Sequence, residues 1–363
     1  MRAPGPHSYG QRMTRVVRAV LLVAALLVVP ALAACEFEPR PNRFEDDRTL
    51  RDRVTEVRIA GGNGSVSVRR GTGGEVTVHR RVTYRGENPT GRFDRVDGTT
   101  LRLDTSCGRR CSIGYVVTMP GAVKVTGHLG AGPIDLREVT EVSVSTDDGA
   151  IVVHDAAGPV RVRSGSGPIT LRAVPEVVAQ TDDGAITVHE ASGPVSALAG
   201  SGPIDLAAVR KVTARTADGA ITVRDAAGDA VVRTGSGPVH ITDVTGAVEA
   251  RTDDGAITLA RIGGAVTAQT GSGPIDGEDL GGTRTVARTA DGAIRLVVPT
   301  VQDIEAHSGS GPIRLVVPPA PDGYRVQTRA PAGPTQVHIA TDPAGGRLLS
   351  VSTDDGAITI DPR

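Results

Sequence analysis

The chain reads Thr181-Asp182-Asp183-Gly184-Ala185-Ile186, then Ala199-Gly200-Ser201-Gly202-Pro203-Ile204, then Thr216-Ala217-Asp218-Gly219-Ala220-Ile221, and this alternation recurs along most of its length. The glycine that precedes Ala-Ile or Pro-Ile/Val returns mostly after 17 or 18 residues, at Gly132, Gly149, Gly167, Gly184, Gly202, Gly219, Gly237, Gly255, Gly273, Gly292, Gly311 and, after a disturbed stretch, Gly356. A fixed period of this size is typical of stacked repeats, each of which buries its apolar side chains only against its neighbours.

Within each unit the apolar residues alternate with polar ones. Ile186 and Val188 follow Gly184 by two and four residues, and a second alternating run with Val195 and Ala197 comes shortly after. Period-two alternation indicates strands, so each unit holds two short strands and two tight turns. Turns of about four residues are too short for the crossover that parallel strands of one sheet need, but they let strands wind as successive sides of a coil. The sequence predicts an all-β fold, a right-handed parallel β-helix, or β-solenoid.

Two coil sizes fit this pattern, one of about 18 residues with two strands and one of about 36 with four. Ser or Thr stands three residues before the turn glycine in ten of the twelve units, in both unit types. These residues are Thr146, Ser164, Thr181, Thr216, Thr234, Thr252, Thr270, Thr289, Ser308 and Thr353. A hydroxyl ladder with this period favours the 18-residue coil.

The spacing of the acidic turns points the same way. In the smaller coil the aspartates fall in every second layer, roughly 9.6 Å apart at a strand spacing of ~4.8 Å. The larger coil would stack the same carboxylates about 4.8 Å apart, where like charges repel. We therefore expect coils of about 18 residues.

Composition limits both the core and the partners. The 363 residues include 46 glycines and seven aromatic residues, none of which lies between Tyr115 and Tyr324, so the repeats must pack on Val, Ile, Leu and Ala. Lys and Arg number 40 against 41 Asp and Glu, for a formal net charge of -1. This balance indicates no basic stripe of the kind that nucleic acid requires.

The N-terminus has the layout of an export signal. A short basic segment, Met13 to Arg18, precedes an apolar run and the sequence Leu32-Ala33-Ala34-Cys35, which resembles the bacterial lipobox. That resemblance implies cleavage before Cys35 and attachment of diacylglycerol to its sulfur. An ordinary secretory signal with an incidental cysteine is the alternative. We assign residues 1–34 to a lipoprotein signal peptide and 35–52 to a lipid-anchored tether.

The two remaining cysteines, Cys107 and Cys111, predict a disulfide in an exported protein. They lie between two strand-like runs, Thr99 to Asp104 and Ile113 to Met119, so we expect the pair to pin a hairpin turn. It belongs to an irregular N-terminal β cap over residues 53–120. The regular solenoid is expected over 121–315, and irregular coils that close the array over 316–363.

The acidic turns are the main candidates for a binding site. They would form one edge of the solenoid that could bind cations, made of Asp148, Asp183, Asp218, Asp254, Asp291 and Asp355. Calcium takes clustered carboxylate and carbonyl oxygens. Asp before Gly is equally what a tight turn favours, because the carboxylate bonds nearby backbone N–H groups. The turn interpretation is the stronger one, so we expect no resident cofactor or metal, with calcium as the alternative.

A carbohydrate-active enzyme on a β-helix would need acids, bases and sugar-stacking aromatics in a groove, usually built by long loops. Here the loops are short and the repeats lack aromatic residues, so we expect no enzyme.

The export signal, the Cys107/Cys111 pair leading into Tyr115-Val116-Val117-Thr118-Met119-Pro120, and the Gly-Ala-Ile-Thr-Val and Ser-Gly-Pro-Ile units resemble the bacterial DUF4097 family of adhesin-like β-strand repeats. The resemblance implies a cell-surface β-solenoid and provides no catalytic residues. We expect a surface-exposed structural or adhesin-like lipoprotein on the extracytoplasmic face of the cell membrane. The alternatives are a module that binds cell-wall glycan or divalent cations, and a degenerate β-helix carbohydrate-active enzyme. The partners expected for the lipoprotein are the membrane, through lipidated Cys35, and a cell-wall or surface glycan or protein.

Overall fold

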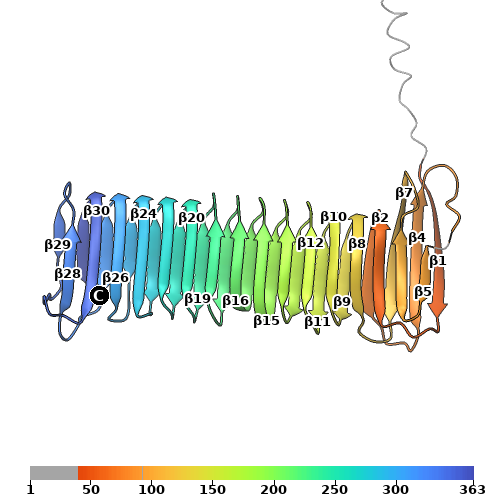
Figure 1. Cartoon of the computed structure of the whole chain (residues 1–363), viewed down its shortest axis with the longest axis horizontal. Helices are drawn as coiled ribbons and strands as arrows, with labels where there is room; N and C mark the ends of the chain where they lie inside the picture. Colours follow the sequence, from red (N-terminus) through yellow and green to blue (C-terminus); the bar gives the residue numbers. More distant parts are fainter. Residues whose placement is uncertain (1–39, 92) are drawn as a thin grey trace, which may run out of the picture. The chain divides into compact units, whose positions relative to one another are not determined.

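The structure, a computed structural model, describes residues 40–91 and 93–363. The predicted signal peptide and Cys35 lie outside the described residues. Residues Arg43–Arg363 form one compact unit. Its described residues form strands and turns without a helix, and the strands lie side by side along one solenoid (Figure 1).

Two parallel faces make up the body of the solenoid. The first face holds the strands that follow the turn glycines: β9 (Ile134–Val139), β11 (Ile151–Ala156), β13 (Ile169–Val174), the first halves of β15 (Ile186–Ala199) and β16 (Ile204–Thr216), β17 (Ile221–Ala226), β19 (Val239–Val244), β21 (Ile257–Ile262), β23 (Ile275–Leu280), β25 (Ile294–Val297) and β27 (Ile313–Val317). The second face holds β8 (Lys124–Ala131), β10 (Val142–Asp148), β12 (Val160–Ser164), β14 (Val177–Thr181), the second halves of β15 and β16, β18 (Ala230–Thr234), β20 (Val248–Asp254), β22 (Val266–Ser272), β24 (Arg284–Asp291) and β26 (Asp303–Ser310).

The register confirms the 18-residue coil. Ile151 of β11 pairs with Ile134 of β9 on one side and with Ile169 of β13 on the other. A 36-residue coil would instead have skipped to the second unit along the chain. The inward Ile, Val and Leu side chains of both faces are buried and form one continuous core, as the alternation predicted. The predicted right hand of the coil stays a prediction.

The turn glycines stack so closely that a side chain has no room. A Cβ placed on Gly237 would lie 2.2 Å from the carbonyl oxygen of Gly219, one coil earlier. The same distance falls between 1.6 and 2.4 Å along the whole series from Gly132 to Gly356. Glycine recurs here because the backbones of successive turns approach each other directly.

The predicted hydroxyl ladder is confirmed and has a specific partner. Each of its ten Ser and Thr side chains is buried, and each donates a hydrogen bond of 2.8 to 3.4 Å to the carbonyl of the stacked turn glycine in the neighbouring coil. The ladder therefore satisfies carbonyl groups that the turn would leave buried without a donor.

The N-terminal end winds out of sequence order. It consists of β1 (Asn42–Leu50), β2 (Glu56–Gly62), β3 (Gly64–Arg70), β4 (Val76–Tyr84), β5 (Asp94–Asp97), β6 (Thr100–Thr105) and β7 (Cys111–Met119). The coil β2–β3 stacks on β8–β9, and the later coil β6–β7 stacks outside it. Strands β4 and β5 then pair antiparallel with β7 and β6, and β1 pairs with β4. The predicted cap of 53–120 thus contains two coils, β2–β3 and β6–β7, that stack in parallel on the body of the solenoid.

Two expectations for this end were wrong. Cys107 and Cys111 do form a disulfide, with Cα atoms 5.6 Å apart, but it does not pin a hairpin. The flanking strands β6 and β7 lie on different faces and pair with β2 and β3, so the disulfide closes a corner of a coil. Residues 42–50, which the sequence analysis assigned to the tether, form strand β1 because their acidic side chains meet a basic strand.

The C-terminal end also departs from sequence order. Its strands are β28 (Tyr324–Arg329), β29 (Thr335–Val337), β30 (Arg347–Asp355) and β31 (Ile358–Pro362). The last coil, β30–β31, lies between β26–β27 and β28–β29, so the earlier segment β28–β29 is the outermost layer. This arrangement lies within the predicted irregular region of 316–363.

Candidate functional site

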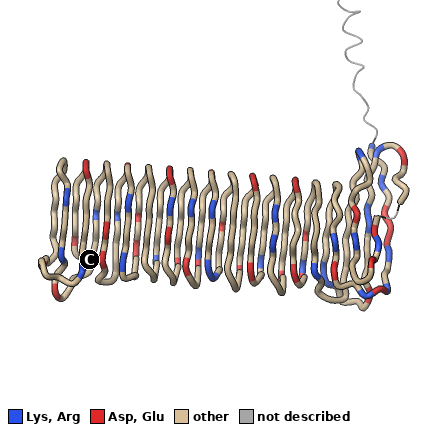
Figure 2. Tube along the Cα trace, in the orientation of Figure 1, with Lys and Arg blue, Asp and Glu red and all other residues tan. Residues whose placement is uncertain are grey.

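The turn edge is the row of side chains just before the stacked glycines, and it contains every aspartate that the sequence analysis singled out. All six lie on this one edge and are exposed: Asp148, Asp183, Asp218, Asp254, Asp291 and Asp355. Red tips along the upper edge in Figure 2 trace this row. The structure thus places the predicted residues on one edge.

Within that row carboxylates and hydroxyls alternate. Asp254 and Asp291 both stand in register with Ser272, and Asp355 stands in register with Ser310. The Ser201 hydroxyl donates a hydrogen bond of 3.3 Å to Asp183 Oδ1. Within the row a serine layer therefore separates successive carboxylates, as the charge argument predicted, and the next carboxylate lies two layers away; Asp148, at one end, stands in register with Ala131.

This spacing bears on metal binding. In the described part of the chain, no group of three or more His, Cys, Asp or Glu side chains is arranged to hold a metal ion. The turn edge presents single carboxylates, and calcium in proteins takes six to eight oxygen ligands. The calcium alternative stays a prediction.

The opposite edge carries a second ladder that the sequence analysis missed. In nine successive coils one residue adopts a left-handed backbone with φ between 51° and 61°, at Glu138, Asp155, Ala173, Glu190, Ala208, Asp225, Asp243, Arg261 and Asp279. The strand register skips this residue, as between the pairs Arg172–His189 and Val174–Ala191, so it interrupts the parallel pairing near the end of these first-face strands. Its signal was the 17- and 18-residue spacing, because residue type varies and glycine is absent.

Side chains of this left-handed ladder form a shallow groove of about 510 Å³ lined by Asp225, Asp243, Arg261 and Asp279 among others. Arg261 donates two hydrogen bonds to Asp243, of 2.5 and 2.7 Å. These bonds lower the pKa of the Asp243 carboxyl and raise the pKa of the Arg261 guanidinium. The groove is thus neutralised at its centre by one bidentate pair.

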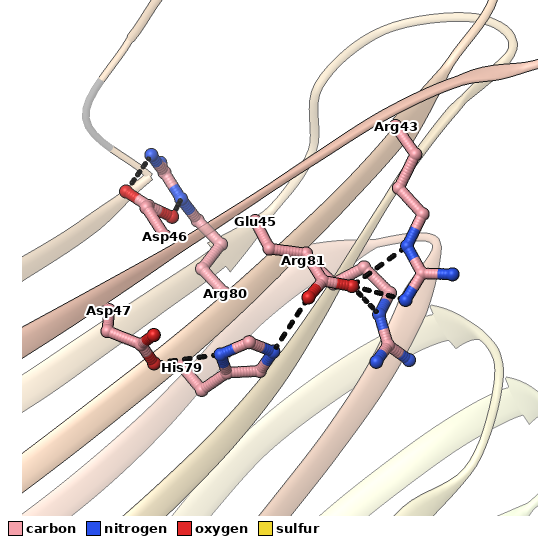
Figure 3. A network of polar contacts seen from close by, with 7 residues as sticks. All are labelled: Arg43, Glu45, Asp46, Asp47, His79, Arg80 and Arg81. Atoms are coloured by element: carbon pink, nitrogen blue, oxygen red, sulfur yellow. Dashed lines mark hydrogen bonds and ion pairs between the residues drawn. The ribbon is translucent and has the colours of Figure 1, made fainter.

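A charge zipper joins β1 to β4 at the N-terminal end (Figure 3). Glu45 accepts hydrogen bonds from Arg81, 2.8 Å away, and from Arg43 of its own strand. Asp46 takes two bonds from Arg80, of 2.8 and 2.7 Å, and Asp47 lies 2.8 Å from His79 Nδ1. The partners run in opposite chain directions, as in antiparallel strands.

Apolar contacts complete the docking of β1. The Arg80 guanidinium lies 5.6 Å from the ring centre of Phe44 and 5.7 Å from that of Phe93, and Leu50 is buried. Exposed ion pairs contribute about 0–1 kcal/mol each, so Leu50 and the stacked Arg80 are the larger contributors to the docking of β1.

The hydrogen bonds from Arg81 and then Arg43 lower the pKa of the Glu45 carboxyl.

The model of the Toastrack DUF4097 family matches residues 54–361. This chain belongs to that family. The matched range includes the out-of-order coils at both ends, so a Toastrack chain here comprises the whole solenoid from β2 to β31. No curated protein matches it.

Three solved structures are similar to this Toastrack chain. One is a candidate cell adhesion protein from Clostridium sporogenes, 7% identical, covering 89% of this chain and 100% of that chain with a TM-score of 0.19. A candidate adhesin from Parabacteroides distasonis is 10% identical over 88% of this chain and 97% of its own, with a TM-score of 0.25. A candidate adhesin from Bacteroides fragilis is 9% identical over 90% and 100%, with a TM-score of 0.20.

The part of the chain that the structure describes offers no helix long and apolar enough to cross a membrane.

Proposed function

We propose that this chain is a surface-exposed, lipid-anchored β-solenoid with a structural or adhesin-like role and without catalytic activity. The observation that carries the proposal is that the recurring polar side chains serve the stack itself. The ladder hydroxyls donate to turn carbonyls, and the turn-edge serines separate the aspartates. The stacking of the coils therefore accounts for these recurring residues without a catalytic or ligand-binding role.

The surface supports the same proposal. An active site usually combines a well-formed pocket with titratable groups whose pKa values are strongly shifted. The described body has shallow grooves such as one of about 460 Å³ on the second face, lined by Ser143, Ser145, Arg161 and Arg163 among others. The carboxyl pKa values of Asp243 and Glu305 are lowered by hydrogen bonds from the exposed arginines Arg261 and Arg288. Ordinary ion pairs account for these shifts.

The anchor is the second part of the proposal. Leu32-Ala33-Ala34-Cys35 precedes the first strand by only a few residues, so a lipid on Cys35 would hold the solenoid at its β1 end. The opposite end, β28–β29, would then be the part presented to the surroundings.

Cells that display the full chain test both parts when compared with cells expressing Cys35→Ser. We expect the displayed chain to fractionate with the membrane and to increase binding of cells to wall or matrix fractions. The Cys35→Ser chain should leave the membrane fraction and lose that binding while keeping the same melting temperature. Mass spectrometry that finds an unmodified Cys35 would refute the anchor. Displayed chain without added binding would refute adhesion, and turnover of any glycan in a panel would refute the non-catalytic assignment.

A further inference from the structure

The last coil of the chain occupies a slot between two earlier coils. Leu349 of β30 pairs with Ile304 of β26 on one side and with Val326 of β28 on the other. The turn glycines give the same order, because a Cβ on Gly356 would lie 2.2 Å from the Gly311 carbonyl oxygen and one on Gly333 would lie 2.0 Å from that of Gly356. The outer coil, β28–β29, therefore precedes the inserted coil, β30–β31, in sequence but lies beyond it at the end of the solenoid.

The inserted coil carries the complete chemistry of the repeat. Thr353 donates a hydrogen bond of 3.0 Å to the Gly311 carbonyl, and Asp355 stands opposite Ser310, which preserves the alternation of the turn edge. Ile358 and Ile360 are fully buried. Because all these contacts are made with other coils, the coil β30–β31 would make the same contacts in the slot of any identical chain.

The connection into the slot is long enough to reach another molecule. Nine residues, 338–346, join β29 to β30 and include Pro343, Gly345 and Gly346. Fully extended they span about 30 Å. In a second molecule that faces this end, the slot lies beneath one outer coil. Crossing the interface and that coil takes two or three strand spacings of ~4.8 Å, about 10–15 Å.

The contacts that hold this connection are few. A bridge links Tyr324 to Thr341, through hydrogen bonds from Tyr324 N to Ala340 O and from Asp342 N to Tyr324 O. At the start of the connection His338 N donates to Ile360 O, and His338 Nδ1 lies 2.8 Å from Asp361 Oδ1, contacts with β31 that an exchanged β31 would also offer. The outer coil itself leaves Val326, Val337 and Ile339 only partly buried against the core. Exchange would open the bridge, and a facing molecule would cover these three side chains.

We propose that the coil β30–β31 is exchanged between two copies of this chain, which joins them end to end at their β28–β29 layers. The exchanged and unexchanged forms share the same slot contacts, so they differ mainly in the strain of the connection and the entropy of association. The pairing is isologous and closes after two copies. Pro331 and Pro334 beside β29 discourage further strands from adding to the outer edge.

Two proteins test this exchange, both as the full chain with Cys35→Ser, and each carries one added cysteine beside the Cys107–Cys111 disulfide. One carries Ser310→Cys and the other Asp355→Cys, at exposed positions that stand in register. Neither chain can form the 310–355 disulfide within itself. We expect a mixture refolded together from denaturant and then oxidised to yield this interchain disulfide, identified by peptide mass mapping, in an amount that rises with protein concentration.

The matched control uses Asp254→Cys and Ser272→Cys, an exposed Asp/Ser pair in register within the body of the solenoid. The 310–355 crosslink should exceed the 254–272 crosslink several-fold, and proteins folded separately before mixing should not form it. Thermal melts establish that all four variants fold. Equal crosslinking of the two pairs, or a co-refolded mixture that stays monomeric at every concentration, would overturn the proposal. The assay contains no cells, so its failure is distinct from failure of the adhesive role.

Discussion

Thr252 Oγ1 lies 3.1 Å from the carbonyl oxygen of Gly237, the turn glycine one coil earlier, and donates a hydrogen bond to it. Both groups are buried, and the same relationship recurs in ten coils. Thr252→Val keeps the shape but removes the donor, so we expect a loss of about 1–3 kcal/mol in the free energy of unfolding. Urea denaturation of the variant and the parent chain measures this difference in the free energy of unfolding. Thr258→Val, half-buried on the outward side of β21, is the control and should change stability by less than about 0.5 kcal/mol.

Ala199 occupies the one position between Thr146 and Thr353 where the hydroxyl ladder is interrupted, and it is buried. Serine fills the equivalent position at Ser164 and Ser308, so its volume fits. Ala199→Ser should supply the missing donor to the turn carbonyl at Gly184 and stabilise the fold by about 0.5–1.5 kcal/mol. A lower melting temperature would mean that this coil is closed by a different packing.

The stacked turns allow no Cβ, so Gly237→Ala should be strongly destabilising. The new methyl carbon would lie 2.2 Å from the backbone oxygen of Gly219, and backbone cannot move aside as a flexible side chain does. We expect a loss of at least about 3 kcal/mol, at the upper end of single substitutions. Gly346→Ala is the control, since a Cβ there meets nothing within 4 Å. Comparable melting temperatures for the two variants would contradict the close approach.

Ala208 holds a left-handed backbone with φ of 52°, which strains any residue with a Cβ. Ala208→Gly should remove this strain and raise stability by up to about 1 kcal/mol, despite the greater entropy of glycine in the unfolded chain. The neighbouring Ala207→Gly has no such strain to remove and should lower stability by about 0.5–1 kcal/mol. The opposite signs of the two changes, read from chemical denaturation, are the diagnostic result.

The β1–β4 zipper should weaken in acid. Arg81 and Arg43 lower the pKa of Glu45, so its contribution is fully present above the unfolded value of about 4.3 and is lost as the pH falls through the lower folded value. At the C-terminal end, His338 and then Arg314 lower the pKa of Asp361, so the contribution of Asp361 to stability is also lost in acid. Melting temperature between pH 6 and pH 3 should fall less steeply for Arg81→Gln than for the parent chain. Arg70→Gln, an exposed arginine at the end of β3, should retain the parent slope.

The sequence was sufficient for the body of the solenoid because every residue there is repeated. Periodic Ile, Gly and Thr positions predicted the coil length, the core and the hydroxyl ladder, and Asp alternating with Ser predicted the separation of the carboxylates. The left-handed ladder escaped prediction because its members include Glu, Ala, Asp and Arg, which share a backbone angle and no chemistry.

The two ends could not be derived in the same way, because they depend on pairings between unlike and distant segments. β1 pairs with β4 through acidic and basic residues that are 32 to 36 positions apart, and nothing local marks either as a strand partner. The hairpin expected at Cys107 and Cys111 failed because β6 and β7 are neighbours in sequence but lie on different faces. The turn-edge aspartates were located correctly, and whether they bind a cation stays a prediction.

The alternation of Asp and Ser along the turn edge gives the chain a parity. A duplication or deletion of one coil would bring two aspartate layers, or two Gly-Ser-Gly turns, into contact, whereas a change of two coils leaves every neighbour as it was. Two successive coils comprise 35 residues, as from Gly184 to Gly219. Length in this protein is therefore quantised, and lineages that lengthen or shorten it should do so in steps of about 35 residues.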